Sequence, residues 1–369
     1  MGIMGERRFN LDEFLEIMLK ENASDLYLKA GSPPRIRTSR GVQVISDREL
    51  SYEDMQSISQ TIMNDASREI FNKHKELDLS YNSAKCGRFR VNVFVQQGQI
   101  GMVLREVKRK ISTFQELNLP VEPLKKFAME PRGLVLVTGP AGCGKSTTLA
   151  SIIEFINENK QSHIITIEDP VEFLHEDKKS LINQREIGTD SHSFSSALKH
   201  VIRQSPDVIL IGEMRDTTTA EAAIMAAETG HLVFSTLHTI DAPATIERIL
   251  NFFPPYIQLQ MRAQLAHILK GVVSLRLLTT LKGERIPAVS IMIPTPTIQK
   301  LIMEDRVSEI REAMEQGEIF GMQTFTQALI KLYKEGKVSY EYAMQMSDAP
   351  TEFSLKTKGI FRGTKEEVV

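Results

Sequence analysis

A glycine-rich segment near the middle of the chain has the residue types that hold a phosphate chain. It reads Gly139-Pro140-Ala141-Gly142-Cys143-Gly144-Lys145-Ser146 and matches the G-x-x-x-x-G-K-[ST] pattern, with an aliphatic run before it and a helical pattern after it. Glycines let backbone N–H groups turn toward the phosphates, and the helix directs its positive dipole end at them. We therefore expect Lys145 to reach the β- and γ-phosphates of ATP and the Ser146 hydroxyl to ligate Mg²⁺. Thr147 completes the expected nucleotide-binding segment.

An acidic residue follows a second aliphatic run. Residues 206–212 form a short buried strand pattern that ends at Glu213. A carboxylate at this place can polarise the attacking water or hold Mg²⁺ through a water molecule. We assign Glu213 as the base or water-positioning residue. A solvated glutamate at a strand end is the ordinary alternative.

A further strand end carries Glu168 and Asp169 directly after the aliphatic residues 164–167. Ligands of an open α/β sheet bind outside the carboxyl ends of its strands. The phosphate loop, Glu168 and Glu213 are therefore expected along one edge of the sheet, with Glu168 as a second catalytic carboxylate. For Glu172, farther along the loop, a surface role and a catalytic role are equally good readings.

Two histidines bracket a fourth aliphatic strand, with His231 before it and His238 after it. A histidine at the carboxyl end can sense the γ-phosphate by hydrogen bonding, whereas a single histidine is often only a satisfied polar residue. Both are kept as candidate catalytic residues. We expect no such placement at a strand end for four further histidines, which are interpreted as ordinary polar residues: His175, His192, His200 and His267.

The strands that must position these residues alternate with helical segments from Arg132 onward. They are expected at residues 134–137, 164–167, 208–211 and 232–234, as a parallel sheet covered on both faces. After about residue 255 the pattern predicts mostly helix, with one extended piece at residues 288–293. The fold class is therefore α/β, with a helical C-terminal region.

A smaller α+β unit is expected before this sheet. Asn10 with Glu13 resembles a capping box, and Ser51 begins a second helix. Residues 88–96 alternate as a strand, and Gly98 allows a turn into another. The strand alternation is lost in residues 108–120, so the predicted domains are 1–110 and 111–369.

Three arginines of the smaller unit are candidates for a role at a nucleotide. Arg88 and Arg90 share the face of their strand away from the aliphatic row, and Arg105 lies on the next strand, which can pair with it as a hairpin. Carboxylates such as Glu76 and Asp78 can neutralise them in surface ion pairs. Alternatively, the arginines supply charge to a phosphate held by a neighbouring subunit.

Composition narrows the class of protein. Hydrophobic residues make up 41% of the 369 residues and charged residues 25%, with no stretch of about 18 apolar residues and no secretion signal. We therefore expect a cytoplasmic protein whose membrane association goes through a partner. Two cysteines exclude a disulfide scaffold and a four-thiolate zinc site. A net charge of -2 without a dense basic tract argues against a specific nucleic-acid partner.

Four segments together resemble the secretion ATPase superfamily. Residues 139–146, 166–172, 207–216 and 228–238 look like its Walker A motif, Asp box, Walker B motif and His box. Within that superfamily the chain is similar to the PilT/PilU pilus-retraction ATPases over nearly its whole length. Further matching segments lie at residues 23–28, 87–92, 183–186 and 321–324.

The resemblance implies a PAS-like N-terminal domain, a RecA-like ATPase domain and a homohexamer with ATP and Mg²⁺ between neighbouring subunits. It implies a motor for type IV pilus retraction and twitching motility, peripheral at the inner-membrane pilus base and acting on a platform protein there. It also favours the trans role for Arg88, Arg90 and Arg105, because the N-terminal domain packs over the neighbour's nucleotide in this family. Two cysteines cannot build the four-cysteine zinc element of the extension ATPases.

Departures from the family pattern point to an accessory paralogue. The motif Ala-Ile-Arg-Asn-Leu-Ile-Arg-Glu is replaced at residues 297–304 by Thr-Ile-Gln-Lys-Leu-Ile-Met-Glu, which lacks both arginines and the asparagine. The tail after Ser347 looks more like that of PilU, and Ala141 replaces a common threonine. The chain is therefore expected to resemble PilU and to work with a paralogous retraction ATPase.

Three other functions would use the same kind of nucleotide site and stay open as alternatives. The first is a secretion-assembly or conjugation traffic ATPase, which differs in its cargo. The second is a low-turnover regulatory subunit of another ATPase ring, which intact Lys145, Ser146, Glu168 and Glu213 disfavour. The third is a nucleic-acid motor, which the charge balance disfavours.

Overall fold

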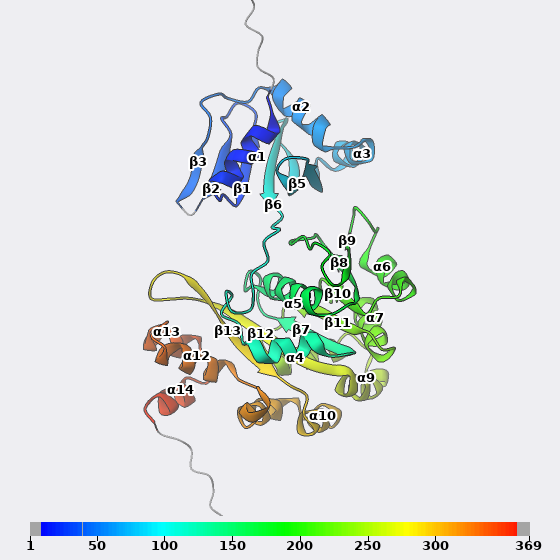
Figure 1. The fold of residues 1–369 in the computed structure, drawn as a ribbon, viewed down its shortest axis with the longest axis vertical. Coiled ribbons are helices and arrows are strands. Elements are labelled where there is room, and N and C mark those ends of the chain that lie inside the picture. The colour runs from blue at the N-terminus through cyan, green and yellow to red at the C-terminus, as the bar shows by residue number, and fades with distance from the viewer. Residues whose placement is uncertain (1–8, 39, 360–369) are drawn as a thin grey trace, which may run out of the picture. The chain divides into compact units, whose positions relative to one another are not determined.

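The computed structural model describes residues 9–38 and 40–359. The chain divides into two compact units, Met1–Arg109 and Lys110–Val369 (Figure 1). Each has a hydrophobic core of its own. No helix among the described residues combines the length and the apolar character needed to cross a bilayer.

The N-terminal unit is built on a six-stranded antiparallel sheet with the order β3-β2-β1-β6-β5-β4. Its strands are β1 (Asp25–Lys29), β2 (Arg35–Thr38), β3 (Gly41–Val44), β4 (Glu76–Ser83), β5 (Gly87–Gln96) and β6 (Gln99–Glu106). Its helices are α1 (Leu11–Lys20), α2 (Tyr52–Ile62) and α3 (Asp65–His74). The predicted hairpin of strands is confirmed as β5 and β6.

Local sequence signals set the helix starts in this unit. Ser51 and Asp54 form a complete capping box at α2. At α1 the Asn10 side chain accepts a hydrogen bond from the Asp12 N–H, while Glu13 bonds the Asn10 amide group rather than its backbone. The α1 helix is therefore capped by one half of the expected box.

The C-terminal unit contains a seven-stranded sheet with the order β13-β12-β7-β11-β10-β8-β9. Its strands are β7 (Gly133–Thr138), β8 (His163–Glu168), β9 (Leu181–Glu186), β10 (Val208–Ile211), β11 (Leu232–Leu237), β12 (Leu269–Thr279) and β13 (Arg285–Met292). Neighbouring strands are parallel except β13, which runs antiparallel to β12. Every residue of β7, β10 and β11 is buried, as near-continuous aliphatic runs predict.

Helices cover this sheet and fix its strand ends. They include α4 (Val121–Met129), α5 (Lys145–Asn159), α6 (Phe194–Val201), α7 (Thr217–Glu228), α8 (Ala242–Leu250) and α9 (Pro255–Ile268). The α5 helix packs on β7 and α4, α6 on β8, and α7 on β7 and β11. The strand–helix alternation expected from the sequence is therefore confirmed.

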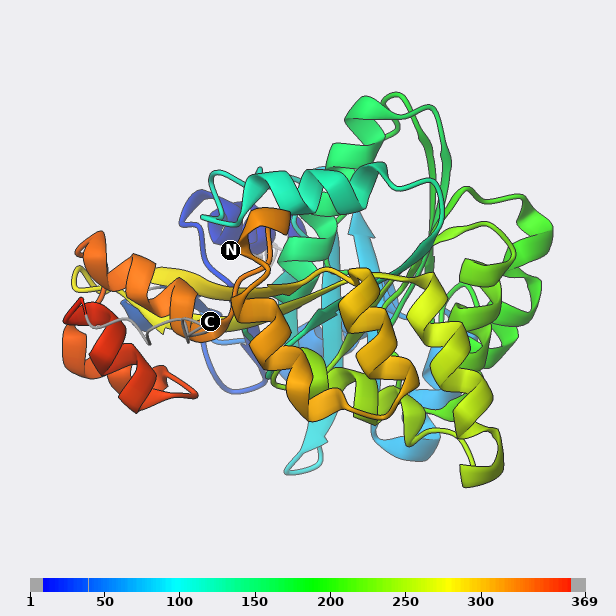
Figure 2. The same ribbon diagram turned by 90° about the horizontal axis from the view of Figure 1, so that it is seen from below.

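The region after residue 255 is less helical than predicted. After α9 the chain enters β12 and returns as β13, so the expected extended piece is half of a hairpin. The helices that follow are α10 (Pro296–Met303), α11 (Ile310–Glu315), α12 (Phe325–Lys334), α13 (Tyr340–Met346) and α14 (Pro350–Thr357). Figure 2 shows α12 to α14, in orange and red, beside this hairpin. There Phe325, Leu329 and Phe353 form a separate small core with Leu278 and Ile286.

Candidate nucleotide site

The phosphate loop folds as its glycines predict. Gly139, Gly142 and Gly144 all have positive φ, at 138°, 74° and 102°. A Cβ on Gly139 would lie 2.4 Å from the Leu275 carbonyl oxygen, so the close approach of the loop to β12 also requires glycine. The α5 helix starts at Lys145, directly after the loop. Its free N–H groups therefore face the loop, as an anion site requires.

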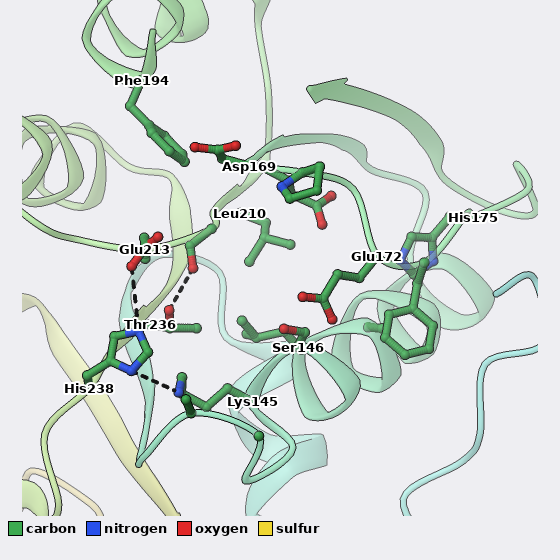
Figure 3. A pocket seen from close by; sticks show the side chains of 18 residues that line it. Lys145, Ser146, Asp169, Glu172, His175, Phe194, Leu210, Glu213, Thr236 and His238 are labelled. Atoms are coloured by element: carbon green, nitrogen blue, oxygen red, sulfur yellow. Dashed lines mark hydrogen bonds and ion pairs between the residues drawn. The ribbon is translucent and has the colours of Figure 1, made fainter. Parts of the chain in front are cut away.

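The loop and three strand ends enclose one cavity of about 270 Å³. Figure 3 shows side chains from α5, from the loop after β8, and from the ends of β10 and β11 converging on it. The predicted residues that line it are Ala141, Gly142, Lys145, Ser146, Glu168, Glu213 and His238. The sequence placed the phosphate loop, Glu168 and Glu213 at one edge of the sheet. The structure brings them together with His238 around one cavity.

Lys145, His238 and Glu213 form a continuous polar chain across this cavity. His238 Nδ1 lies 3.5 Å from Lys145 Nζ, and its Nε2 lies 3.6 Å from a Glu213 oxygen (Figure 3). The Lys145 ammonium also donates to the carbonyl oxygens of Gly139 at 2.7 Å and Pro140 at 3.0 Å. Burial lowers the pKa of Lys145, while nearby Cys143, Glu213 and others oppose that shift. The ammonium is thus held at the mouth of the loop.

Glu213 has a second partner that sequence reasoning missed. Arg215, two residues later, forms an ion pair with it. The hydrogen bond to Glu213 raises the pKa of Arg215, and Arg215 stays two-thirds exposed while Glu213 is largely buried. The available signal in the sequence was the spacing of Glu213 and Arg215. Two residues that are two apart in an extended segment point their side chains to the same side.

Glu168 is a partly buried acid of the cavity. Its Oε1 accepts a hydrogen bond of 2.6 Å from Thr166 and a longer one of 3.4 Å from Gln184 on β9. Burial raises the pKa of Glu168, and these two hydrogen bonds oppose the rise. A carboxylate held in this way sits at the end of β8, beside the cavity into which the phosphate loop opens.

The loop after β8 contributes more to the cavity than the sequence indicated. Asp169 and Glu172 both line it, and Glu172 points in toward Ser146 (Figure 3). His175 lines it too, with its Nδ1 2.7 Å from Glu154 on α5 and its side chain only 3% exposed. Glu172 therefore belongs to the cavity, and His175, which had no assigned placement, ties the loop to the phosphate-loop helix.

His231 does not join this group. It precedes β11, whereas His238 follows it, so the two histidines lie at opposite ends of one strand. The Nδ1 of His231 contacts the Ala226 carbonyl at 3.0 Å and the Thr229 hydroxyl at 3.2 Å. His231 therefore does not line this cavity, because only the carboxyl end of a parallel strand faces it, and a catalytic role for His231 stays a prediction.

The three arginines of the N-terminal unit lie on neighbouring strands. Arg90 and Arg105 are direct partners in the β5–β6 ladder, and Arg88 lies two residues before Arg90 on the same face. Arg105 pairs with Asp25 of β1. The expected carboxylates, Glu76 and Asp78, instead accept hydrogen bonds from Asn92. The prediction of carboxylate partners thus holds for Arg105 with a different partner.

The oxygen atoms around Ser146 fit a bound magnesium ion. The Ser146 hydroxyl and the Glu172 carboxylate share the cavity, and Mg²⁺ prefers one or two such protein groups together with substrate phosphates. Neutralising negative charge on phosphate oxygens is the chemistry that the ion would supply. The residues of the site therefore suit a nucleotide that arrives with its metal.

Comparison with known proteins matches almost the whole chain. The family model described as Type II/IV secretion system protein matches residues 7–357. The type IV pilus retraction ATPase PilT of Pseudomonas aeruginosa is 44% identical over 344 residues, covering 93% of this chain and all of the relative. The type IV pilus ATPase PilU of the same organism is 39% identical, covering 94% and 91%. A crystal structure of the pilus retraction motor PilT with bound ADP is 42% identical, with a TM-score of 0.87 over 93% of this chain and 98% of that one.

Proposed function

The chain belongs to the type II/IV secretion system protein family, and we propose that it is an ATP-hydrolysing motor of type IV pilus retraction. The observation that carries this proposal is the cavity in which the phosphate loop, Glu168, Glu213 and His238 converge. Support comes from the full-length similarity to PilT, which is named a retraction ATPase. Twitching motility is the cellular process that such a motor serves.

The side chains of the cavity divide the work of hydrolysis. Backbone N–H groups at the start of α5 and the Lys145 ammonium would bind the β- and γ-phosphates, and the Ser146 hydroxyl would hold the magnesium ion. Glu213 lies at the far end of the polar chain from Lys145 and positions the attacking water. His238 stands between them and contacts both, so it can report the state of the γ-phosphate to Glu213.

The arginines are assigned to a second subunit. A trans arginine is worth about 10³- to 10⁵-fold in rate for P-loop enzymes. Arg88 and Arg90 lie on one face of β5, and their unit would present this face to the nucleotide of a neighbouring copy in a homohexamer. Arg105 belongs to the same face but is also bound to Asp25, so its role is partly to hold the sheet together.

The ring is proposed to act from the cytoplasm at the inner-membrane base of the pilus. There it would pass domain movements to a membrane platform protein, as the resemblance to retraction motors implies. Binding of ATP and Mg²⁺ at each subunit boundary would drive those movements. A specific nucleic acid has no part in this proposal.

A PilU-like accessory motor is the second candidate, favoured by the outer surface of α10. Ile298, Leu301 and Ile302 are buried, so the helix keeps its apolar side. Its exposed positions include Lys300 and Met303 in place of the Asn and Arg of the retraction motif. A motor with this altered surface would join a paralogous retraction ATPase rather than replace it.

Removal of the gene tests the proposed function. Retraction and twitching should be lost or weakened, and wild-type protein should restore them while the Lys145→Ala protein should not. Weakened retraction that depends wholly on a paralogue supports the accessory role. Unchanged retraction in a strain that also lacks every paralogue would overturn a retraction function.

A further inference from the structure

The Gln184 side chain makes three hydrogen bonds, one to Glu168 at the end of β8 and two to the acidic loop that follows it, residues 169–180. Its Oε1 accepts from the His175 N–H at 2.9 Å. Its Nε2 donates to the Phe173 carbonyl oxygen at 2.8 Å and to Glu168 Oε1 at 3.4 Å. One amide group therefore joins the edge strand β9 to the last residue of β8 and to the middle of this loop.

The pairing resembles a rung of a β-ladder. A carbonyl oxygen and an N–H two residues apart, at Phe173 and His175, are both satisfied by one planar amide. Such groups would otherwise lack partners in a loop that is partly enclosed. The amide of Gln184 supplies donors and an acceptor together, whereas an ionised carboxylate supplies only acceptors and the hydroxyl of Ser or Thr lies on a shorter side chain.

We propose that Gln184 is a positioning residue of the hydrolytic site, which holds Glu168 and the acidic loop in the arrangement required for turnover. This inference rests on the proposed role of Glu168 in hydrolysis. Gln184 acts through Glu168 and the loop, since it is not among the residues that line the cavity.

The loop has a second attachment, on α5. His175 contacts Glu154, and Lys178 contacts both Glu154 and Glu158. The loop is thus fixed to the phosphate-loop helix on one side and to β9 on the other, through Gln184 and through Glu186, whose side chain accepts a hydrogen bond of 3.1 Å from the Val171 N–H. Losing the Gln184 side chain would leave the other attachments and the β8–β9 ladder in place, but would free the Glu168 carboxylate and the backbone of Phe173 and His175 from β9.

The ionisation of Glu168 gives a readout that a purely structural role would not move. Burial raises its pKa, and the hydrogen bonds from Thr166 and Gln184 lower it, so removing either donor should raise the pKa further. As the solution is acidified, turnover that needs the ionised carboxylate should then be lost at a higher pH than in the wild type. The charged or titratable groups around the same cavity are Lys145, Asp169, Glu172, His175, Glu213 and His238.

The test compares the pH dependence of ATP turnover in four variants. Gln184→Leu removes all three bonds at similar volume, and Gln184→Glu keeps the acceptor but removes both donors and adds a like charge. Thr166→Val removes the other donor to Glu168. Asn183→Ala is the matched control, since Asn183 is the preceding residue of β9 and bonds His163 instead.

Both Gln184 variants should lower kcat by about 10- to 100-fold, as loss of positioning does, with a much smaller change in KM. The acid limb of their kcat profiles should move to higher pH, and Thr166→Val should move it in the same direction. Asn183→Ala should keep the wild-type profile. Thermal melting confirms folding, and Gln184→Glu alone carries the test if Gln184→Leu does not fold.

The Glu168→Gln variant separates two kinds of failure. If it loses turnover while both Gln184 variants keep the wild-type rate and profile, the positioning role of Gln184 is wrong and the role of Glu168 stands. If Glu168→Gln itself turns over normally, the proposed role of Glu168 is wrong and the inference falls with it. A loss of rate in Gln184 variants without movement of the acid limb would also overturn the inference.

Discussion

Arg105 and Asp25 form an ion pair across neighbouring strands of the N-terminal sheet. They are direct partners in the β1–β6 ladder, and Arg105 Nη2 lies 2.7 Å from an oxygen of Asp25. The Asp25 side chain is only 2% exposed, and Arg37 approaches it from the other side at 3.7 Å. Both arginines therefore stabilise the charge of a buried carboxylate. Arg105 therefore differs from Arg90, its partner in the next ladder.

Arg105→Ala should destabilise the N-terminal unit more than Arg90→Ala. It leaves the buried Asp25 carboxylate with a longer ion pair to Arg37 and a hydrogen bond from the Ser24 hydroxyl, which costs about 1–3 kcal/mol. None of the ion pairs found within the described ranges involves Arg90, so its loss should cost less than about 0.5 kcal/mol. Chemical denaturation of the two variants measures the difference. Equal stability of both variants would show that the Asp25 contact contributes nothing.

Mixed rings should reveal arginines that act across subunits. An Arg88→Ala/Arg90→Ala subunit leaves Arg105 and its ion pair in place, so it avoids the stability loss expected for Arg105→Ala. This subunit and a Lys145→Ala subunit should each be inactive alone and partly active when mixed, because some boundaries then combine an intact loop with intact arginines. Absence of recovery in rings shown to be mixed, or full activity of the double variant alone, would contradict the trans role.

Glu213→Gln should slow hydrolysis without abolishing nucleotide binding. Loss of a water-positioning base costs about 10²- to 10⁴-fold in the chemical step. Lys145 and the loop remain, so ATP should stay bound and accumulate on the enzyme. Single-turnover hydrolysis and equilibrium binding of ATP measure the two steps separately. Lost affinity combined with an unchanged chemical step would reverse the assignment.

The Glu154 contacts predict a pH-dependent contribution to stability. Burial would raise the Glu154 pKa, but hydrogen bonds from His175 and Lys178 hold it at about 2, below the ordinary 4.5. A lowered folded-state pKa stabilises the protein above the unfolded pKa, and this stabilisation is lost as the pH falls toward 2. Wild type should therefore exceed Glu154→Gln by roughly 2–4 kcal/mol near pH 6, with the gap narrowing at lower pH.

Unfolding free energies of the two proteins between pH 6 and pH 3 check this prediction. A gap that stays constant over that range would show that Glu154 is not held ionised by its partners. Because Glu154 lies on α5 and His175 on the acidic loop, the same measurement reports how firmly the loop is attached to the phosphate-loop helix.

The sequence predicts the central strands and their site because burial on both faces leaves continuous aliphatic runs. The runs at β7, β8, β10 and β11 place the loop, Glu168, Glu213 and His238 at one edge, as the structure shows. His231 precedes β11 and so lies at the other end of that strand, away from this edge.

Strands with mixed composition were missed for a physical reason. The β9 strand is at the sheet edge and carries Asn183, Gln184 and Arg185, so it has no aliphatic run to detect. The β12 strand follows α9 without a break and includes Ser274 and Arg276. Contacts such as Gln184 to Glu168, or Arg105 to Asp25, depend on strand order, which spacing along the chain does not specify.

Phosphate release by the purified protein tests the central claim, hydrolysis at the cavity around Lys145, most directly. Wild-type protein with Mg²⁺ and ATP should release phosphate steadily. Lys145→Ala should release it at least about 100-fold more slowly, with an unchanged melting temperature and the same oligomeric state. Within residues 9–38 and 40–359, the hydrogen bonds of the Lys145 ammonium go to two loop carbonyls and His238, and none joins it to the core. A folded Lys145→Ala protein that hydrolyses ATP at close to the wild-type rate would contradict the assignment of this site.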